Sequence, residues 1–344
     1  MSQNILELRN VDVCLDAGAD QQVRILRDLS LDIERGSFVA IVGESGCGKS
    51  ITVHSIVKLL PENLRLATGS VTLHTDDGSV RLDTLPQYGR EIRSIRGGRI
   101  GMIFQDTLSS LNPAHKVGRQ VMENLLEHTK LTRAQAKART IELFGHLGIP
   151  DPVRRFDAYP HEMSGGMRQR VMIAIALACN PDLIIADEPT TALDVTIQAQ
   201  IMELLKRLQA EQRKTFILIT HNMGLVAEVA DAVAVMYLGR VVEWGTREQV
   251  LRDPRHPYTA ALLQSVPSLG MDRDRELLTV AGQTPNPAEV QDGCEFAGRC
   301  PFVQERCRTG EISMRDVGDG HQARCVLAED TSLSDKVAEV GAHV

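Results

Sequence analysis

The sequence predicts an α/β fold built around a phosphate-binding loop, and three observations support this prediction. The segment Gly43 to Ser50 fits the phosphate-loop pattern G-x-x-x-x-G-K-S/T. From Ile5 to about Ser265, short apolar runs alternate with segments of helical periodicity, which is the layout of an α/β domain. The acidic pair Asp187 and Glu188 ends one apolar run, at the edge where open α/β sheets bind their ligands.

The phosphate loop lies between a predicted strand and a predicted helix, which is the context that its function requires. The apolar run Phe38 to Val42 predicts a buried strand, and apolar residues recur at helical spacing from Val53 until Pro61. Backbone N–H groups of such a loop surround phosphate oxygens, and the helix N-terminus adds partial positive charge. We expect Lys49 to reach the outer phosphates and Ser50 to hold Mg²⁺. The residues expected to bind the nucleotide here are Gly43, Glu44, Ser45, Gly46, Cys47, Gly48, Lys49, Ser50 and Ile51.

Two groups of strands are expected in the first 265 residues. Ile5 to Leu15 and Ile25 to Ile33 suit antiparallel strands that lead to the strand before the phosphate loop. Leu183 to Ala186 and Phe216 to Thr220 follow helical segments and suit a parallel sheet. The sequence therefore predicts an antiparallel unit joined to a parallel one.

The remaining segments predict an insert, a hairpin and a second, smaller domain. Helical periodicity with mixed charges predicts a helical subdomain inserted at about residues 106–175. The runs within 233–244 are joined by a glycine-containing turn and predict a hairpin. The composition then turns to Gly, Pro, Asp and Cys, so we expect a main domain over residues 1–265 and a C-terminal extension over 266–344.

The composition excludes several classes of protein. With 344 residues, 43% of them hydrophobic and 24% charged, the chain is typical of a soluble globular protein. Its longest apolar runs are far shorter than the roughly 20 residues that span a bilayer. The N-terminus lacks the features of a secretion signal, which predicts a reducing, cytosolic environment. A formal net charge of -7 argues against nucleic acid as the main partner.

The acidic pair at the end of the apolar run 183–186 predicts catalytic chemistry beside the phosphate loop. Asp187 is expected to reach Mg²⁺, and Glu188 to orient and polarise a water molecule in line with the terminal phosphate. A polar strand end before a turn at Pro189 is the alternative interpretation. The phosphate loop earlier in the chain favours the catalytic one.

A second anion site is predicted at Ser164, Gly165 and Gly166. Two glycines at the start of a predicted helix leave backbone donors uncovered, and such donors bind anions. Taken alone, Ser-Gly-Gly is more often a plain helix cap.

Six motifs in one order resemble those of the ATP-binding cassette (ABC) family. They are the phosphate loop, Gln105 in Ile103-Phe104-Gln105, the Ser164 segment, Asp187-Glu188, Thr191-Ala192-Leu193-Asp194, and His221 in Ile219-Thr220-His221. The resemblance implies a P-loop NTPase fold of the ABC nucleotide-binding type. It includes an antiparallel β subdomain, an inserted α-helical subdomain and, in this chain, a small cysteine-containing C-terminal extension.

The same resemblance implies roles for individual residues and an assembly. Gln105 contacts Mg²⁺ and the water, His221 bonds to the terminal phosphate, and Asp194 lies across a dimer interface. Two ATP molecules are then held between the phosphate loop of one subunit and the Ser164 segment of the other. Leu15 occupies the position where the family usually places an aromatic ring against adenine, so aliphatic packing would replace ring stacking.

Further segments resemble the ATPases of bacterial oligopeptide, dipeptide and nickel importers. These segments are Leu111-Asn112-Pro113, Met163 to Ala178, Ala192 to Gln200, His256 to Leu263 and Cys294 to Pro301. The resemblance implies an ATPase that energises import of peptides or related small solutes. Its implied partners are a second ABC ATPase (a sister chain or a copy), two integral membrane permease subunits and an extracytoplasmic solute-binding protein. It would then lie peripherally on the cytoplasmic face of the bacterial inner membrane, docked near Gln105 and the helical insert.

Two alternatives to peptide import are open at this stage. A nickel or other solute importer of the same subclass would carry the same motifs. A soluble ABC ATPase that acts on ribosomes or DNA belongs to another class, but such proteins normally have paired cassettes or a long coiled coil, and this chain has one cassette without sustained heptads.

Four of the seven cysteines lie in the last fifth of the chain, which suggests a metal centre in a cytosolic protein. Cys294, Cys300, Cys307 and Cys325 are spaced C-x5-C-x6-C-x17-C, without the close pairs of common zinc sites. An iron-sulfur cluster of the 4Fe-4S type tolerates such spacing better and is what members of the resembled subclass carry. Zinc and reduced structural cysteines are the alternatives.

Overall fold

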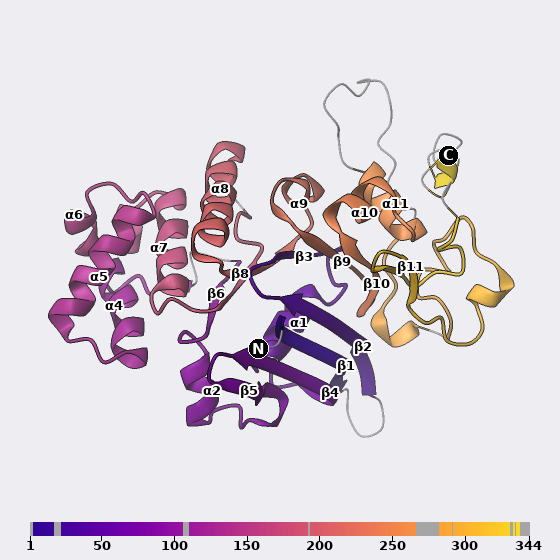
Figure 1. The fold of residues 1–344 in the computed structure, drawn as a ribbon, viewed down its shortest axis with the longest axis horizontal. Helices are drawn as coiled ribbons and strands as arrows, with labels where there is room; N and C mark the ends of the chain where they lie inside the picture. Colours follow the sequence, from indigo (N-terminus) through magenta and orange to yellow (C-terminus); the bar gives the residue numbers. More distant parts are fainter. Residues whose placement is uncertain are drawn as a thin grey trace.

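A computed structural model of the chain describes residues 3–16, 22–105, 110–191, 193–265, 282–290, 292–330, 333 and 335–337. The start of the predicted insert at residue 106 and the predicted domain boundary at residues 265 and 266 fall at or beyond the ends of described ranges. Figure 1 shows a group of helices at one side of the central sheet and the C-terminal extension at the other. The antiparallel strands form a separate layer against that sheet.

The first sheet is antiparallel, as the sequence predicts for its first strands. Its order is β2-β1-β4-β5, with bounds β1 Asn4–Asp16, β2 Gln22–Glu34, β4 Leu64–Thr75 and β5 Gly78–Arg81. Alternate apolar residues such as Leu6, Val13 and Leu31 are buried against the central sheet. A 3-10 turn, η1 Leu82–Thr84, and helix α2 Arg90–Ile95 follow this sheet.

The second sheet contains eight strands and carries the predicted site. Its order is β11-β12-β10-β9-β3-β8-β7-β6. The bounds are β3 Phe38–Val42, β6 Ile100–Ile103, β7 Leu183–Asp187, β8 Thr215–Thr220, β9 Ala232–Tyr237, β10 Arg240–Thr246, β11 Arg315–Gly318 and β12 His321–Ala323. Strands β3, β6, β7, β8 and β9 run parallel, and every residue of β3 and β7 is buried, as in sheets covered on both faces.

The helical group lies at the edge of the central sheet that β6 forms (Figure 1). That group contains α4 Val117–His128, α5 Arg133–His146 and α6 Pro152–Phe156, which pack with α7 Gly165–Leu177. The 3-10 turn η2 Pro160–Glu162 precedes α7. Thr132 begins α5 with a capping box, because its side chain accepts from Gln135 N–H and the Gln135 side chain accepts from Thr132 N–H. Buried Val121, Phe144 and Val171 belong to one core.

The remaining helices within the described residues are α1 Lys49–Ile56, α8 Val195–Gln212, α9 Met223–Val229, α10 Arg247–Arg252 and α11 Pro257–Gln264. The expectation that the helix after the phosphate loop continues to Pro61 is wrong. It ends at Ile56 because Lys58 adopts φ 52° and Leu59 N–H returns to the His54 carbonyl at 2.8 Å. The predicted hairpin is confirmed: β9 and β10 pair antiparallel around Leu238 and Gly239, which have φ 43° and 82°.

The C-terminal extension continues the central sheet. Strand β12 pairs with β10, and β11 pairs with β12; the 3-10 turns η3 Pro287–Glu289 and η4 Glu305–Cys307 precede them. At this junction the carboxylate of Glu243 is fully buried and accepts hydrogen bonds from His321 Nε2 and from two backbone N–H groups. Within the described residues, no helix is both long and apolar enough to cross a membrane.

Candidate nucleotide site

The phosphate loop leaves β3 through a glycine that the fold requires. Gly43 has φ 150°, and a Cβ there would lie 2.2 Å from the Met236 carbonyl oxygen of the neighbouring strand. The hairpin turn supports the loop from outside, since Gly239 N–H donates to the Cys47 carbonyl at 2.8 Å. Gly48, at φ 105°, then turns the chain into α1. The loop is therefore held by neighbouring backbone on one side while the helix begins on the other.

Lys49 lies folded back onto the loop. Its Nζ donates to the carbonyl oxygens of Gly43 at 2.8 Å and Glu44 at 2.9 Å, and its side chain is buried. Cys47 is also buried, and burial raises the pKa of its thiol. A neutral, packed Cys47 fits the small space beside Lys49.

The predicted magnesium ligands are neighbours. Ser50 Oγ, in the first turn of α1, donates to Asp187 Oδ1 at 3.2 Å. Asp187 ends β7, and burial raises the pKa of its carboxyl despite the hydrogen bond from Ser50. A hydroxyl and a carboxylate oxygen are the hard donors that Mg²⁺ prefers, so this pair fits the ion.

Glu188 is the centre of the predicted catalytic group. It adopts φ 45°, and its N–H donates to the Ile219 carbonyl of β8. Its carboxylate accepts from Gln105 Nε2 at 2.9 Å and lies 3.2 Å from His221 Nδ1. The structure thus brings together three residues that are far apart in the sequence.

Thr191 also contacts this carboxylate, and no role for its side chain was predicted from the sequence. Its hydroxyl donates to Glu188 Oε2 at 3.0 Å. The spacing of three residues after Glu188 in a turn is the only local signal of this contact. Glu188 is consequently held from three directions, with 15% of its side chain exposed.

Ser164 and Asp194 both begin helices. Ser164 Oγ accepts from Met167 N–H at 3.3 Å at the start of α7, and Asp194 Oδ1 accepts from Ile197 N–H at 2.9 Å at the start of α8. The two helix starts are close, because a Cβ on Gly166 would lie 2.9 Å from Ile197 Cγ2. Helix α7 packs on β6, α4 and α5, whereas α1 packs on β2 and β7, so the two predicted anion sites lie on separate parts of the fold (Figure 1).

Leu15, the expected adenine contact, lies one residue before the end of β1. It pairs with Val23 on β2 and Leu64 on β4 and is half-buried. Its role at a base stays a prediction.

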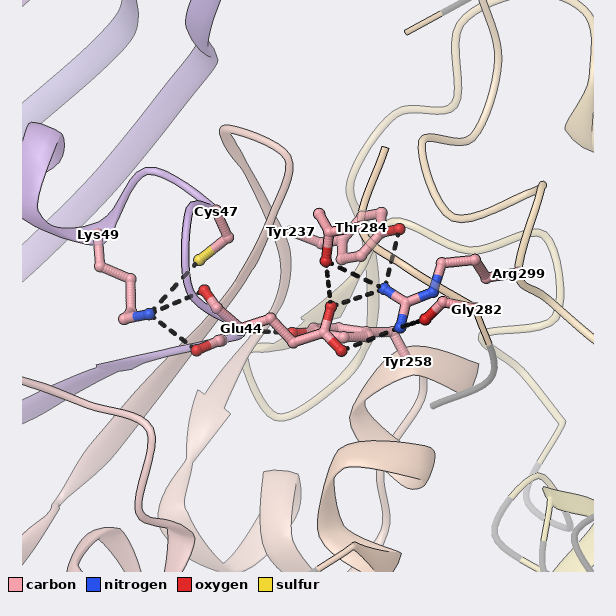
Figure 2. Close-up of polar contacts among 9 residues, drawn as sticks. Glu44, Cys47, Lys49, Tyr237, Tyr258, Gly282, Thr284 and Arg299 are labelled. Carbon is pink, nitrogen blue, oxygen red and sulfur yellow. Dashed lines mark hydrogen bonds and ion pairs between the residues drawn. The ribbon is translucent and has the colours of Figure 1, made fainter. Parts of the chain in front are cut away.

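Residues far from the phosphate loop in sequence hold Glu44, the second residue of the loop. Tyr258, on α11, is fully buried, and its hydroxyl accepts from Glu44 N–H at 2.8 Å. Arg299 and Thr284, from the extension, donate to the Glu44 carboxylate (Figure 2). These contacts were not predicted, since no local pattern links Glu44 to them.

The four C-terminal cysteines line one shared cavity. Burial raises the pKa of Cys294 to about 12 and the pKa values of Cys300 and Cys325 to about 11. Among the described residues, no three His, Cys, Asp or Glu side chains are placed to hold a single metal ion. The cavity is therefore shared by the thiols without an arrangement for one ion.

Backbone N–H groups are directed at these sulfurs in a repeated pattern. Cys294, Cys300 and Cys325 each accept a hydrogen bond from the N–H two residues further on, and for Cys325 this N–H lies 3.3 Å from Sγ. His256 lines the same cavity, and its Nδ1 accepts from Tyr258 N–H, which leaves the proton on Nε2. This buried nitrogen has no hydrogen-bond partner among the described residues. The backbone N–H donors lower the pKa values of the thiols, although burial raises them by more.

Two family descriptions match the chain. The family described as "ABC transporter" matches residues 26–191, and the family described as "Oligopeptide/dipeptide transporter, C-terminal region" matches residues 242–307. The first match contains the phosphate loop and the acidic pair. The second contains residues 242–246 of β10 and three of the four C-terminal cysteines.

Curated relatives and solved structures agree with these matches. A putative peptide import ATP-binding protein of Brucella ovis is 44% identical over 330 residues, which cover 94% of this chain and 97% of the relative. The dipeptide transport ATP-binding protein DppD of Bacillus subtilis is 44% identical over 327 residues, covering 95% of this chain and 96% of the relative. A solved ATP-binding cassette dimer in a post-hydrolysis state, bound to ADP and Pi, has a TM-score of 0.61 and 29% identity over 70% of this chain and 98% of its own.

Proposed function

The chain belongs to the ATP-binding subunits of ABC transporters, and on that premise we propose that it hydrolyses ATP to drive a bacterial importer of peptides. The single observation that carries the ATPase assignment is the Glu188 carboxylate, which Gln105, Thr191 and His221 hold beside the Ser50–Asp187 pair. The names of the relatives, peptide import and dipeptide transport ATP-binding proteins, support peptides as the cargo. Nothing in the comparisons favours nickel, ribosomes or DNA.

The residues of the site have different roles in ATP hydrolysis. Lys49 exchanges its contacts with the loop carbonyls for the outer phosphates, which carry stronger negative charge. Ser50 and Asp187 would hold Mg²⁺, which would supply positive charge against the phosphate oxygens. Glu188 accepts a hydrogen bond from the attacking water and orients it, while Gln105 and His221 fix the carboxylate.

The Ser164 segment, with Gly165 and Gly166, contacts the nucleotide bound to a second cassette. Its helix start offers N–H donors to phosphate, as does the phosphate loop, but on another part of the same chain. Two cassettes facing each other therefore complete two sites, with Asp194 at the interface and Leu15 against adenine. Hydrolysis removes the phosphate that both subunits grip, and the cassettes separate.

The partners follow from this role. The second cassette is a copy or a sister chain, and two membrane permease subunits and an extracytoplasmic solute-binding protein complete the importer. The chain then lies peripherally at the cytoplasmic face of the inner membrane.

Two substitutions test the assignment of the site. Glu188→Gln retains the shape of the side chain but removes the base, so ATP binding should persist, closed cassette dimers should accumulate and turnover should cease. Lys49→Ala should weaken ATP binding itself. Dimer formation is measured by size-exclusion chromatography with MgATP, and hydrolysis by phosphate release. Turnover at the parent rate in Glu188→Gln would falsify the role of Glu188.

Uptake by cells tests the cargo. A strain that lacks this chain should lose uptake of a radiolabelled dipeptide, and the parent gene should restore it while the Lys49→Ala gene should not. Unchanged dipeptide uptake together with lost nickel uptake would overturn the peptide assignment and favour the nickel alternative.

For the C-terminal cysteines we propose a 4Fe-4S cluster held by Cys294, Cys300, Cys307 and Cys325. The repeated N–H donors to sulfur, His256 Nε2 and the cavity that the four cysteines share support bound thiolates. The spacing of the cysteines, without the close pairs of common zinc sites, favours a cluster over zinc. When bound, the cluster supplies a cross-link for a small unit with few apolar residues. Iron and acid-labile sulfide are to be measured on anaerobically purified protein, with Cys300→Ser as the comparison. One zinc per chain without sulfide would rule the cluster out.

A further inference from the structure

The C-terminal extension forms a bidentate ion pair with the phosphate loop. Arg299 Nη1 donates to Glu44 Oε2 at 2.6 Å, and Nη2 donates to Oε1 at 3.0 Å. Thr284 Oγ1 donates to Oε2 at 2.7 Å. Arg299 lies 255 positions after Glu44, so this ion pair links the phosphate loop to an extension that is distant in the sequence (Figure 2).

The guanidinium of Arg299 is itself fixed in place. Its side chain is 6% exposed, and Nη2 also donates to the Gly282 carbonyl at 3.1 Å. The group lies over the rings of Tyr237 and Phe296, at 5.8 and 6.0 Å from their centroids. Hydrogen bonds in the plane of the guanidinium and aromatic rings against its face hold it in one orientation toward the carboxylate. A lysine ammonium on a flexible side chain would not be held in one orientation.

Glu44 is held at its backbone as well as at its carboxylate. Its N–H donates to the buried Tyr258 hydroxyl, and its carbonyl accepts from Lys49 Nζ. Burial alone raises the pKa of Glu44, but hydrogen bonds from Arg299 and Thr284 outweigh burial and lower it. The charge of Lys49 lowers this pKa too, so the carboxylate acts electrostatically on the lysine that is expected to bind phosphate.

These contacts have an electrostatic consequence for ATP. An ionised carboxylate on a loop that binds a triphosphate repels the ligand unless a cation neutralises it. We propose that Arg299 is a positioning residue of the ATP site, which neutralises and fixes Glu44 so that the phosphate loop binds ATP tightly. The inference rests on the proposed role of the phosphate loop, and it makes the docked extension a part of the nucleotide site.

ATP affinity of the purified full-length chain tests this inference. Arg299→Met should raise the Kd for MgATP about tenfold, within the usual range of coupling between sites. The double variant Arg299→Met with Glu44→Gln should return the Kd to within about threefold of the parent, because contacting residues couple and the repelling charge is gone. Arg299→Lys, which keeps the charge without the fork, should fall between parent and Arg299→Met.

The kinetic readout separates positioning from chemistry. Arg299→Met should raise KM for ATP and leave kcat within about twofold, because uniform binding is lost while Glu188 is untouched. Arg308→Met is the matched control: it removes an exposed arginine from the same extension and should change neither parameter.

The outcomes distinguish this inference from the proposed function. Parent-like ATP binding by Lys49→Ala would overturn both. Loss of ATP binding in Lys49→Ala together with a parent-like Kd in Arg299→Met would overturn the inference alone. A double variant whose Kd for MgATP is as high as that of Arg299→Met would also overturn it, since removing the Glu44 charge repairs a charge defect and not a folding defect.

Hydrogen exchange of the parent protein provides a test without any variant. Coupling between two sites is reciprocal, so ATP should slow amide exchange in peptides that contain Thr284 and Arg299 as well as in the phosphate loop. Protection of the loop with no change in the extension would contradict the inference, even where Arg299→Met does not fold.

Discussion

Replacing Glu243 with alanine should detach the C-terminal extension from the central sheet. Glu243 is fully buried in β10; its Oε1 accepts from Arg255 N–H at 2.7 Å and from His321 Nε2 at 2.8 Å, and its Oε2 accepts from His256 N–H at 3.0 Å. Alanine leaves these three donors buried without an acceptor. The expected loss of unfolding free energy is about 3–5 kcal/mol, the usual cost of removing one partner from a buried charged group.

Glutamine at this position should cost less, and its defect should be local. Its amide oxygen can replace Oε1 for Arg255 and His321, but its NH₂ group then faces the N–H of His256. One lost hydrogen bond with an unsatisfied donor costs about 1–3 kcal/mol.

Urea unfolding and hydrogen exchange measure these effects together. Unfolding midpoints give the global change, and exchange at Arg324 N–H, which donates to the Val242 carbonyl, reports the junction. Glu248→Ala is the control, because its carboxylate is exposed and pairs with Arg252 only at 3.9 Å. The reasoning fails if Glu243→Ala unfolds like Glu248→Ala, or if glutamine is as damaging as alanine.

Two further predictions concern the hairpin turn and pH. Gly239→Ala should destabilise the chain by more than the roughly 1–2 kcal/mol that a left-handed backbone costs, because the new Cβ lies 2.1 Å from the Ile25 carbonyl oxygen. Gly310 also has positive φ but lies in open space, so Gly310→Ala should cost only this backbone contribution. Urea unfolding compares the two variants, and equal losses of unfolding free energy would refute the proposed clash. Burial lowers the pKa of His256 from 6.5 to about 3, so the unfolded chain binds a proton that the folded chain does not. Unfolding free energy should therefore fall as pH decreases from 6.5 towards 3. His256→Asn, which keeps an acceptor at the start of α11, should flatten this slope; an unchanged slope would contradict the assignment.

The sequence was most informative where structure is local. The run Phe38 to Val42 is a buried strand, and the hairpin turn at Leu238 and Gly239 follows from residues that favour positive φ. The pairing of Ser50 with Asp187 was predictable because parallel strand ends share an edge of the sheet.

Contacts between distant segments were not predictable from the sequence. Glu243 interrupts an apolar strand, and only the donors of Arg255, His256 and His321 explain why a charge is buried there. The Glu44–Arg299 pair likewise has no local pattern. Helix α1 ended early for a backbone reason at Lys58 that apolar periodicity does not record.

The position of strand β10 in the central sheet determines how the protein tolerates truncation. It pairs with β9 on one side and with β12, from the extension, on the other. A fragment cut at residue 265 would present the unpaired backbone of β10 to solvent, with Trp244 beside it and Glu243 deprived of its histidine partner. Such an unpaired edge strand can pair with strands of other molecules, so the truncated ATPase should aggregate under conditions in which the intact chain stays in solution.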